Sequence, residues 1–287
     1  MSMQQYLGLA LQASIMLTVL GLGLTASWQE ATYLLRKPAM LLRSVLAMSV
    51  LLPIVAVVIV RTFAFPLEIE AALVALAISP VPPLLHMKQL KSGGRREFVV
   101  GLLAGMGLLA IVLVPVSVAI LNAVFSTSLL VPPQTVAAVV LKTILVPLAL
   151  GLLIHRWVPA VGKAARPVIA LAFVLLLVAT VLLLYGMWPV TRTLLGNGVG
   201  LMLAVVAAIG LLVGHLLGGP RAEDRTTLAM ATAARHPAVA LTIASATQAS
   251  KPSLLAVILL YVVIATIITI PYQKWRQRGA QSESPGA

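Results

Sequence analysis

Apolar stretches of about 20 residues recur along the whole chain, and each is long enough to cross the ~30 Å hydrocarbon core of a bilayer. Of the 287 residues, 61% are hydrophobic and only 9% are charged. Soluble domains average about 25% charged residues, because they must keep their surface in water. The sequence therefore predicts an all-α polytopic membrane protein in a lipid bilayer, with no soluble domain between its spans.

We expect about nine transmembrane helices, of which the third and the eighth are discontinuous. The uninterrupted ones are predicted at Tyr6–Thr25, Ala39–Phe63, Phe98–Phe125, Gln134–Trp157, Pro167–Trp188, Val199–Gly218 and Leu254–Tyr272. The third begins near Leu67 and is broken at Pro80, Pro82 and Pro83, since consecutive prolines cannot continue a helix. The eighth begins near Glu223 and is broken before Pro237.

The spans form one predicted membrane domain over residues 1–275, with a first repeat at about 1–126 and a second at about 132–275. Residues 276–287 are polar and are expected to be a disordered cytoplasmic tail. The first residues have no basic region and no clear cleavage site, so we expect a retained first helix rather than a signal peptide.

The net charge of +13 is distributed in a way that argues against a nucleic-acid partner, which would need a basic patch on a solvated domain. Fourteen Lys and Arg lie in odd-numbered links or near the C-terminus: Arg36, Lys37, Lys88, Lys91, Arg95, Arg96, Arg156, Lys163, Arg166, Arg221, Arg225, Lys274, Arg276 and Arg278. Only Arg61, Arg192 and Lys251 lie in even-numbered links. The positive-inside rule then predicts a cell (inner) membrane protein with its N-terminus outside and its C-terminus in the cytoplasm.

The two broken helices run antiparallel in this topology and occupy corresponding places in the two repeats. Paired interrupted helices of this kind are typical of a transporter binding site at the membrane midplane. Unpaired backbone groups are tolerated at that depth only where protein buries them or water reaches them. The alternative interpretation is a pair of simple proline kinks.

Charged residues inside the spans are basic only. All seven acidic residues lie in links, at helix ends or in the tail, which excludes a mid-membrane carboxylate relay or a carboxylate-bound cation. The chain has no cysteine and no H-E-x-x-H motif, so we expect no metal, no cofactor and no enzyme activity. The embedded basic side chains are Arg43, Lys142, Arg235, His86 and His236.

Arg235 and His236 are the strongest candidates for binding a ligand. Pro237 suits the first position of a half-helix, whose N-terminus favours negative charge. The planar guanidinium of arginine matches a carboxylate, sulfonate or phosphate. His86 and Lys88 follow the first break and are expected to complete the pocket. Lys142 either joins the pocket or bonds to helix carbonyls, and Arg43 is expected to extend to the cytoplasmic interface.

Several stretches together resemble the bile acid:sodium symporter family. GLGLT at Gly21–Thr25 is similar to its second-helix motif, although alone it indicates only close packing through small residues. LKTILVPLALGLLIHR is similar to its sixth helix, and SPVPPLLHMKQL and DRTTLAMATAARHPAVALTIA fall at its two crossover helices. The resemblance implies a panel and a core, inverted repeats and two unwound helices that cross at the centre. It also implies that this chain starts at the family's second helix.

The sequence departs from that family where its members bind Na⁺ through Glu, Gln, Asn and Ser side chains. The corresponding residues here are Ala231, Arg235, His236, Leu85, His86 and Met48. No Ser or Thr occurs between Phe98 and Val116 either. We therefore expect fixed positive charge to replace bound sodium, with transport that is facilitated or coupled to protons through the two histidines.

These features predict a secondary transporter of small organic anions that works by alternating access, independently of Na⁺, with a basic midplane pocket. One alternative is a conventional Na⁺-coupled organic anion or bile acid symporter whose ions are held by backbone carbonyls. Another is a non-transporting anion receptor or an anion channel. The sequence leaves the oligomeric state open.

Overall fold

The computed structural model describes residues 3–63, 65–82, 89–90, 92–125, 133–245 and 251–282. Within these ranges the regular structure is helical, with no strand. Seven helices are long and apolar enough to cross a membrane: Tyr6–Gly23, Pro38–Thr62, Arg96–Phe125, Ala137–Trp157, Ala165–Gly186, Val199–Leu217 and Pro252–Arg278. The predicted class, an all-α polytopic membrane protein, is thus confirmed. The count of nine stays a prediction, because the two broken segments are divided and the first continues outside the described residues.

The elements follow the predicted spans closely. The first half contains α1 (Met3–Gly23), α2 (Trp28–Ala31), η1 (Leu34–Arg36), α3 (Pro38–Val45), η2 (Leu46–Leu51), α4 (Leu52–Thr62), α5 (Leu67–Ile78) and α7 (Arg96–Phe125). The second contains α8 (Pro133–Val140), η4 (Leu141–Leu145), α9 (Val146–Trp157), η5 (Pro159–Ala164), α10 (Ala165–Gly186), α11 (Trp188–Gly196), α12 (Val199–Leu217), α13 (Ala222–Ala233), α14 (Pro237–Ala244) and α15 (Lys251–Ser282). Of these, η2 and η4 are π turns inside longer helices.

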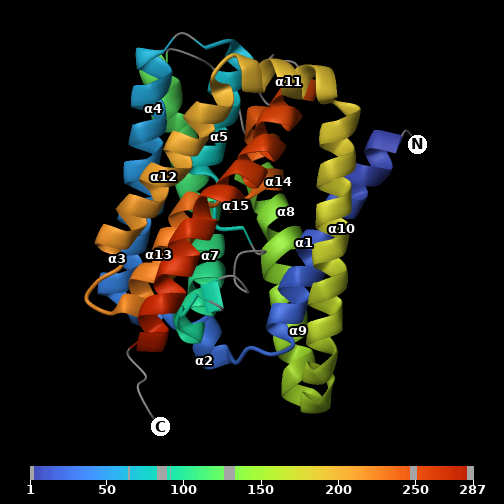
Figure 1. Ribbon diagram of the computed structural model, residues 1–287. Coiled ribbons are helices and arrows are strands. Elements are labelled where there is room, and N and C mark those ends of the chain that lie inside the picture. Colours follow the sequence, from blue (N-terminus) through green and yellow to red (C-terminus); the bar gives the residue numbers. More distant parts are fainter. Residues whose placement is uncertain are drawn as a thin grey trace.

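The helices form two groups (Figure 1). In one, α1 packs against α9 and α10; in the other, α12 packs against α13 and α15, and α5 packs against α4, α14 and α15. The connection between the groups runs through α8 and η4, which contact α7, and α8 also contacts α14. The expected panel corresponds to the first group and the expected core to the second.

Glycines allow α1 to approach its two neighbours closely. A Cβ atom on Gly21 would lie 2.5 Å from Cγ1 of Ile169 in α10, and a Cβ atom on Gly23 would lie 2.6 Å from the carbonyl oxygen of Leu148 in α9. Without a hydrophobic driving force inside the bilayer, such small residues let helix backbones meet and gain packing energy. The interpretation of GLGLT as a close-packing motif is confirmed.

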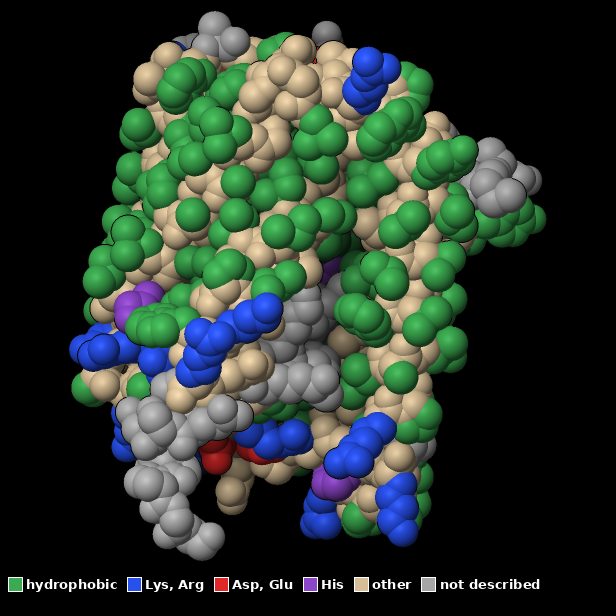
Figure 2. Space-filling view, in the orientation of Figure 1, with side chains coloured by type: hydrophobic (Ala, Val, Ile, Leu, Met, Phe, Trp, Pro, Cys, Tyr) green, Lys and Arg blue, Asp and Glu red, His purple; other side chains and the backbone are tan. Residues whose placement is uncertain are grey.

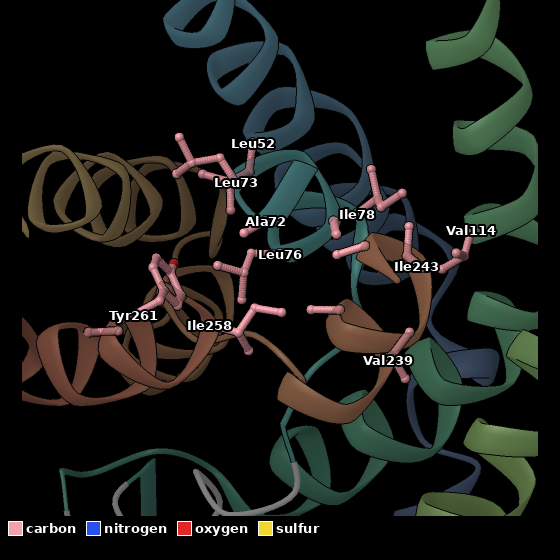
Figure 3. Close-up of a cluster of buried hydrophobic side chains, with 14 of the residues drawn as sticks. Leu52, Ala72, Leu73, Leu76, Ile78, Val114, Val239, Ile243, Ile258 and Tyr261 are labelled. Carbon is pink, nitrogen blue, oxygen red and sulfur yellow. The ribbon is translucent and has the colours of Figure 1, made fainter. Parts of the chain in front are cut away.

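The short helices α5 and α14 lie at the centre of the core (Figure 3). Their side chains Leu73, Leu76, Val239 and Ile243 pack with Ile258 of α15, and all five are buried. Beyond the first turn of α5, which contains Glu68 and Glu70, all side chains of the two helices are apolar except that of Thr242. The described parts of the two broken segments are therefore packed into the core.

Two segments differ from the sequence prediction. Residues 189–196, taken as part of a link, lie in helix α11 (Trp188–Gly196), which has a proline in its first turn. The tail predicted to be disordered from residue 276 is helical to Ser282, because α15 continues without a break. Gln, Arg and Lys favour helix nearly as well as apolar residues do, so the change to polar residues does not stop the helix. Residues 283–287 lie outside the described chain.

Candidate functional site

The two helix breaks meet in the middle of the core. After α5, Ser79 is extended (φ −72°, ψ 150°), and after α13, Ala234 is extended too (φ −102°, ψ 147°). The backbone N–H of His236 donates a hydrogen bond to the carbonyl oxygen of Pro80 at 3.0 Å. One break thus satisfies a backbone group of the other, which reduces the cost of leaving peptide groups unpaired at this depth.

Arg235 lies at this crossing and is almost fully buried, with 2% of its surface exposed. Its Nη1 donates to the carbonyl oxygen of Ser79 at 3.0 Å, and its Nη2 donates to the carbonyl oxygen of Met48 at 3.3 Å. Its Nε has no partner among the described residues. Both ion pairs of the described chain are elsewhere, so carbonyl dipoles rather than a carboxylate stabilise this guanidinium.

His236 is fully buried next to Arg235 and caps the N-terminus of α14. Its Nδ1 accepts a hydrogen bond from the backbone N–H of Val239 at 3.4 Å, and its Nε2 lies 3.3 Å from Oγ1 of Thr143. A ring nitrogen that accepts carries no proton, so in the neutral ring the proton is on Nε2. The Thr143 hydroxyl itself donates to the carbonyl oxygen of Val139 at 2.7 Å, which leaves its oxygen free to accept from His236.

Arg235 and His236 each have one partner in a π turn. Met48 lies in η2 and Thr143 in η4, and each turn is followed by a proline, Pro53 or Pro147. Proline lacks the N–H that would bond four residues back, so the preceding turn of helix widens and leaves backbone groups available. The π turn η2 of the core therefore presents the carbonyl oxygen of Met48 to Arg235. The π turn η4, which continues into α9 of the panel, presents the hydroxyl of Thr143 to His236.

A cavity of about 220 Å³ lies between α10 and α15, beside the second break. Its wall is mostly apolar and includes Phe173, Leu176, Leu177, Leu259, Val262 and Val263, while Arg235, Pro82 and Pro237 line it at the break. Figure 2 shows a hollow between the two helix groups on this face. The hydroxyl oxygen of Thr180, which also lines the cavity, is buried and has no partner among the described residues.

The structure brings only part of the predicted pocket together. Arg235, His236, Pro80, Pro82 and Pro237 lie at or beside the crossing. Lys142 lies in η4, one residue before Thr143, and its side chain is exposed. His86, Lys88 and Pro83 lie outside the described residues.

Sequence reasoning missed four participants: the hydroxyls of Thr143 and Thr180, the carbonyl oxygen of Ser79, and Tyr261. Tyr261 is buried and donates from its hydroxyl to the carbonyl oxygen of Ala233 at 2.6 Å, at the end of α13. A lone tyrosine in the middle of the apolar run of α15 was the one available signal for it. Backbone carbonyls leave no mark in a sequence.

Comparison of the chain with the curated proteins finds no match. The family model of the Sodium Bile acid symporter family matches residues 13–189, which include the first break and end before the second. This match covers more than half of the chain, and with the membrane helices and their crossing breaks it shows that the protein belongs to the Sodium Bile acid symporter family of membrane transporters.

Proposed function

We propose that the protein is a secondary transporter of small organic anions that works by alternating access without coupling to Na⁺. The observation that carries the proposal is the buried guanidinium of Arg235 at the crossing of the two breaks. It supplies a fixed positive charge at the place where unwound backbone would otherwise attract a cation. The pocket would lie near the midplane, with the N-terminus outside the cell membrane and the C-terminus in the cytoplasm.

Sodium binding at this crossing would need oxygen ligands that Arg235 already uses. The carbonyl oxygens of Ser79 and Met48 both accept from its terminal nitrogens. A second cation placed there would also be repelled by the guanidinium at short range, and in a low-dielectric interior that repulsion is large. The same charge attracts an anion.

The cavity favours an amphipathic anion as substrate. Its apolar wall suits a hydrocarbon body, while Nε of Arg235 and the hydroxyl of Thr180 both lack partners among the described residues. Ligand sites commonly combine an apolar wall with a few polar groups that fix the orientation of the ligand. His86, Lys88 and Lys142 remain proposed contributors of positive charge.

Alternating access would need the panel and the core to move relative to each other. The hydrogen bond between His236 and Thr143 joins them at the crossing. In this proposal it breaks when the anion has bound and the core changes its position.

The test is the thermal stability of the purified protein in sodium or choline salt, with a panel of organic carboxylates, sulfonates and bile acids. An anion that stabilises the protein equally in both salts supports the proposal, and that anion is then used in uptake assays with proteoliposomes. The stabilisation should disappear in Arg235→Gln and persist in Arg192→Gln, which changes an exposed arginine in α11. Arg235→Lys, which keeps the positive charge, should retain part of the stabilisation by the anion.

The family name itself favours a second candidate, Na⁺-coupled symport. In that case the anion would stabilise the protein only when sodium is present, and uptake in choline would be absent. Either result would overturn the sodium-independent proposal while leaving the transporter class intact.

A further inference from the structure

A cluster of arginines surrounds the turn between α12 and α13, at the opposite end of α13 from the crossing. Arg43 of α3 lies so close to this turn that a Cβ atom on Gly219 would be 2.5 Å from its Nη1. Arg225 of α13 donates from Nε to the carbonyl oxygen of Gly219 at 2.7 Å. Gly219 has a positive φ of 88°, so a side chain there would strain the backbone as well as displace Arg43. The turn thus holds two guanidinium groups side by side.

The C-terminal part of α15 adds a third arginine and two aromatic rings. Arg276 donates from Nε to Oγ1 of Thr226 at 2.8 Å, and its guanidinium carbon lies 5.3 Å from the ring centroid of Trp275. Tyr272 bonds through its hydroxyl to Nδ1 of His215 at 2.9 Å. Figure 2 shows Lys and Arg side chains beside a histidine at one edge of the apolar belt.

None of these three arginines forms an ion pair with an acidic side chain of the described residues. The two ion pairs within the described chain are Arg95 with Asp224 and Arg96 with Glu30. No terminal nitrogen of Arg43, Arg225 or Arg276 bonds to another described residue. Three guanidinium groups therefore have donors available for an outside partner.

The surface next to the cluster is apolar and faces away from the protein. On α12, Leu212 and Leu216 are 58% and 70% exposed, and on α3 Leu42 is 69% exposed. The elements α3 and α12 contact each other, and we refer to their surface that carries these leucines and Arg43 as the seam. A ligand for this seam would need an anionic head and apolar chains.

We propose that this cluster binds the phosphodiester headgroup of an anionic phospholipid, with its acyl chains along Leu42, Leu212 and Leu216. Guanidinium groups form paired hydrogen bonds with phosphate oxygens, and basic pockets between helices at the cytoplasmic side attract anionic lipids. Trp275 and Tyr272 suit the interface, where aromatic rings with a polar edge are enriched. The inference does not depend on sodium coupling or on the transported anion.

Trp275 provides the reporter for a test. In a protein with Trp28→Phe, Trp157→Phe and Trp188→Phe, Trp275 is the only tryptophan left, since the chain has four. This protein is reconstituted in dioleoyl phosphatidylcholine with increasing fractions of brominated phosphatidylglycerol or brominated phosphatidylcholine. We expect brominated phosphatidylglycerol to quench the fluorescence of Trp275 at a lower lipid fraction than brominated phosphatidylcholine does. This preference for the anionic lipid should fall at high salt, because screening weakens the attraction of the headgroup.

Arg43→Gln should lower the preference by about fivefold, the usual contribution of one basic residue near an anionic membrane surface. Arg192→Gln, at the other end of the bundle, should leave it unchanged. Equal quenching by both lipids before any arginine is changed would overturn the proposal, and so would a preference that is as large in Arg43→Gln as in the parent protein. Loss of the preference on adding inorganic phosphate, but not on adding sodium chloride of the same ionic strength, would identify a free-phosphate site instead and would likewise overturn the lipid proposal.

Discussion

The guanidinium of Arg235 occupies a space bounded by carbonyl oxygens, which is the chemistry that a small hard cation also prefers. We expect Arg235→Gln to destabilise the protein in choline salt by about 1.5–3 kcal/mol, the contribution of hydrogen bonds to a charged group. Sodium should restore part of that loss, because the glutamine amide adds an oxygen to the carbonyls of Ser79 and Met48. The measurement is the unfolding midpoint of both proteins in each salt. Equal destabilisation in sodium and choline would show that no cation site had been vacated.

The hydroxyl of Thr143 is the described side-chain partner of the buried Nε2 of His236. Thr143→Val keeps the shape of the side chain and removes the acceptor, so it should cost about 1–3 kcal/mol of stability. Thr143→Ser retains the hydroxyl and should stay near the parent. Thr242→Val is a second control, because that hydroxyl bonds only within its own helix α14. The measurement is the thermal unfolding midpoint of the parent protein and of the three variants. Equal midpoints for Thr143→Val and Thr242→Val would mean that the contact between Thr143 and His236 adds no stability.

Helix α12 lies against α13 through a stripe of glycines, Gly210, Gly214 and Gly218, that recurs every fourth residue. A Cβ atom on Gly214 would lie 2.5 Å from Cα of Ala229, a backbone atom that cannot give way. Gly214→Ala should therefore destabilise the protein by about 1–3 kcal/mol through overpacking. Gly196→Ala is the matched change, since no atom lies within 4 Å of a Cβ atom there, and it should be neutral or slightly stabilising. The yield in detergent and the unfolding midpoint are measured for both variants. An unchanged unfolding midpoint in Gly214→Ala would refute the close contact between α12 and α13.

The sequence predicted where the helices and their breaks lie better than it predicted which residues contact each other. Uninterrupted helices such as α7 and α10 could be located because lipid requires about 20 apolar residues in a row. The breaks could be located because Pro80 and Pro237 limit where a helix continues. The π turns could not, since the prolines that follow them also fit an ordinary kink. The contact between Thr143 and His236 could not either, because residues 93 positions apart meet only through the packing of whole helices.

At the scale of the whole molecule, charged side chains have different kinds of partner at the helix ends and at the crossing. Arg95 pairs with Asp224 of α13 and Arg96 pairs with Glu30 of α2, so both ion pairs lie where α7 begins. The crossing has instead a positive charge held by carbonyls. Charge is thus compensated by acidic side chains near the ends of the helices, and by backbone dipoles at the crossing.

The orientation of the molecule is a prediction from the fourteen Lys and Arg in one set of links against three in the other. The absence of cysteine makes this testable without background labelling. Lys163 and Arg192 are both exposed and lie in the segments that precede and follow α10. Because α10 spans the membrane, a cysteine at one position must be outside when the other is inside. We expect an impermeant maleimide to label Arg192→Cys in intact cells and Lys163→Cys only after permeabilisation. The reverse pattern would invert the topology and move the arginine cluster around Gly219 to the outer surface.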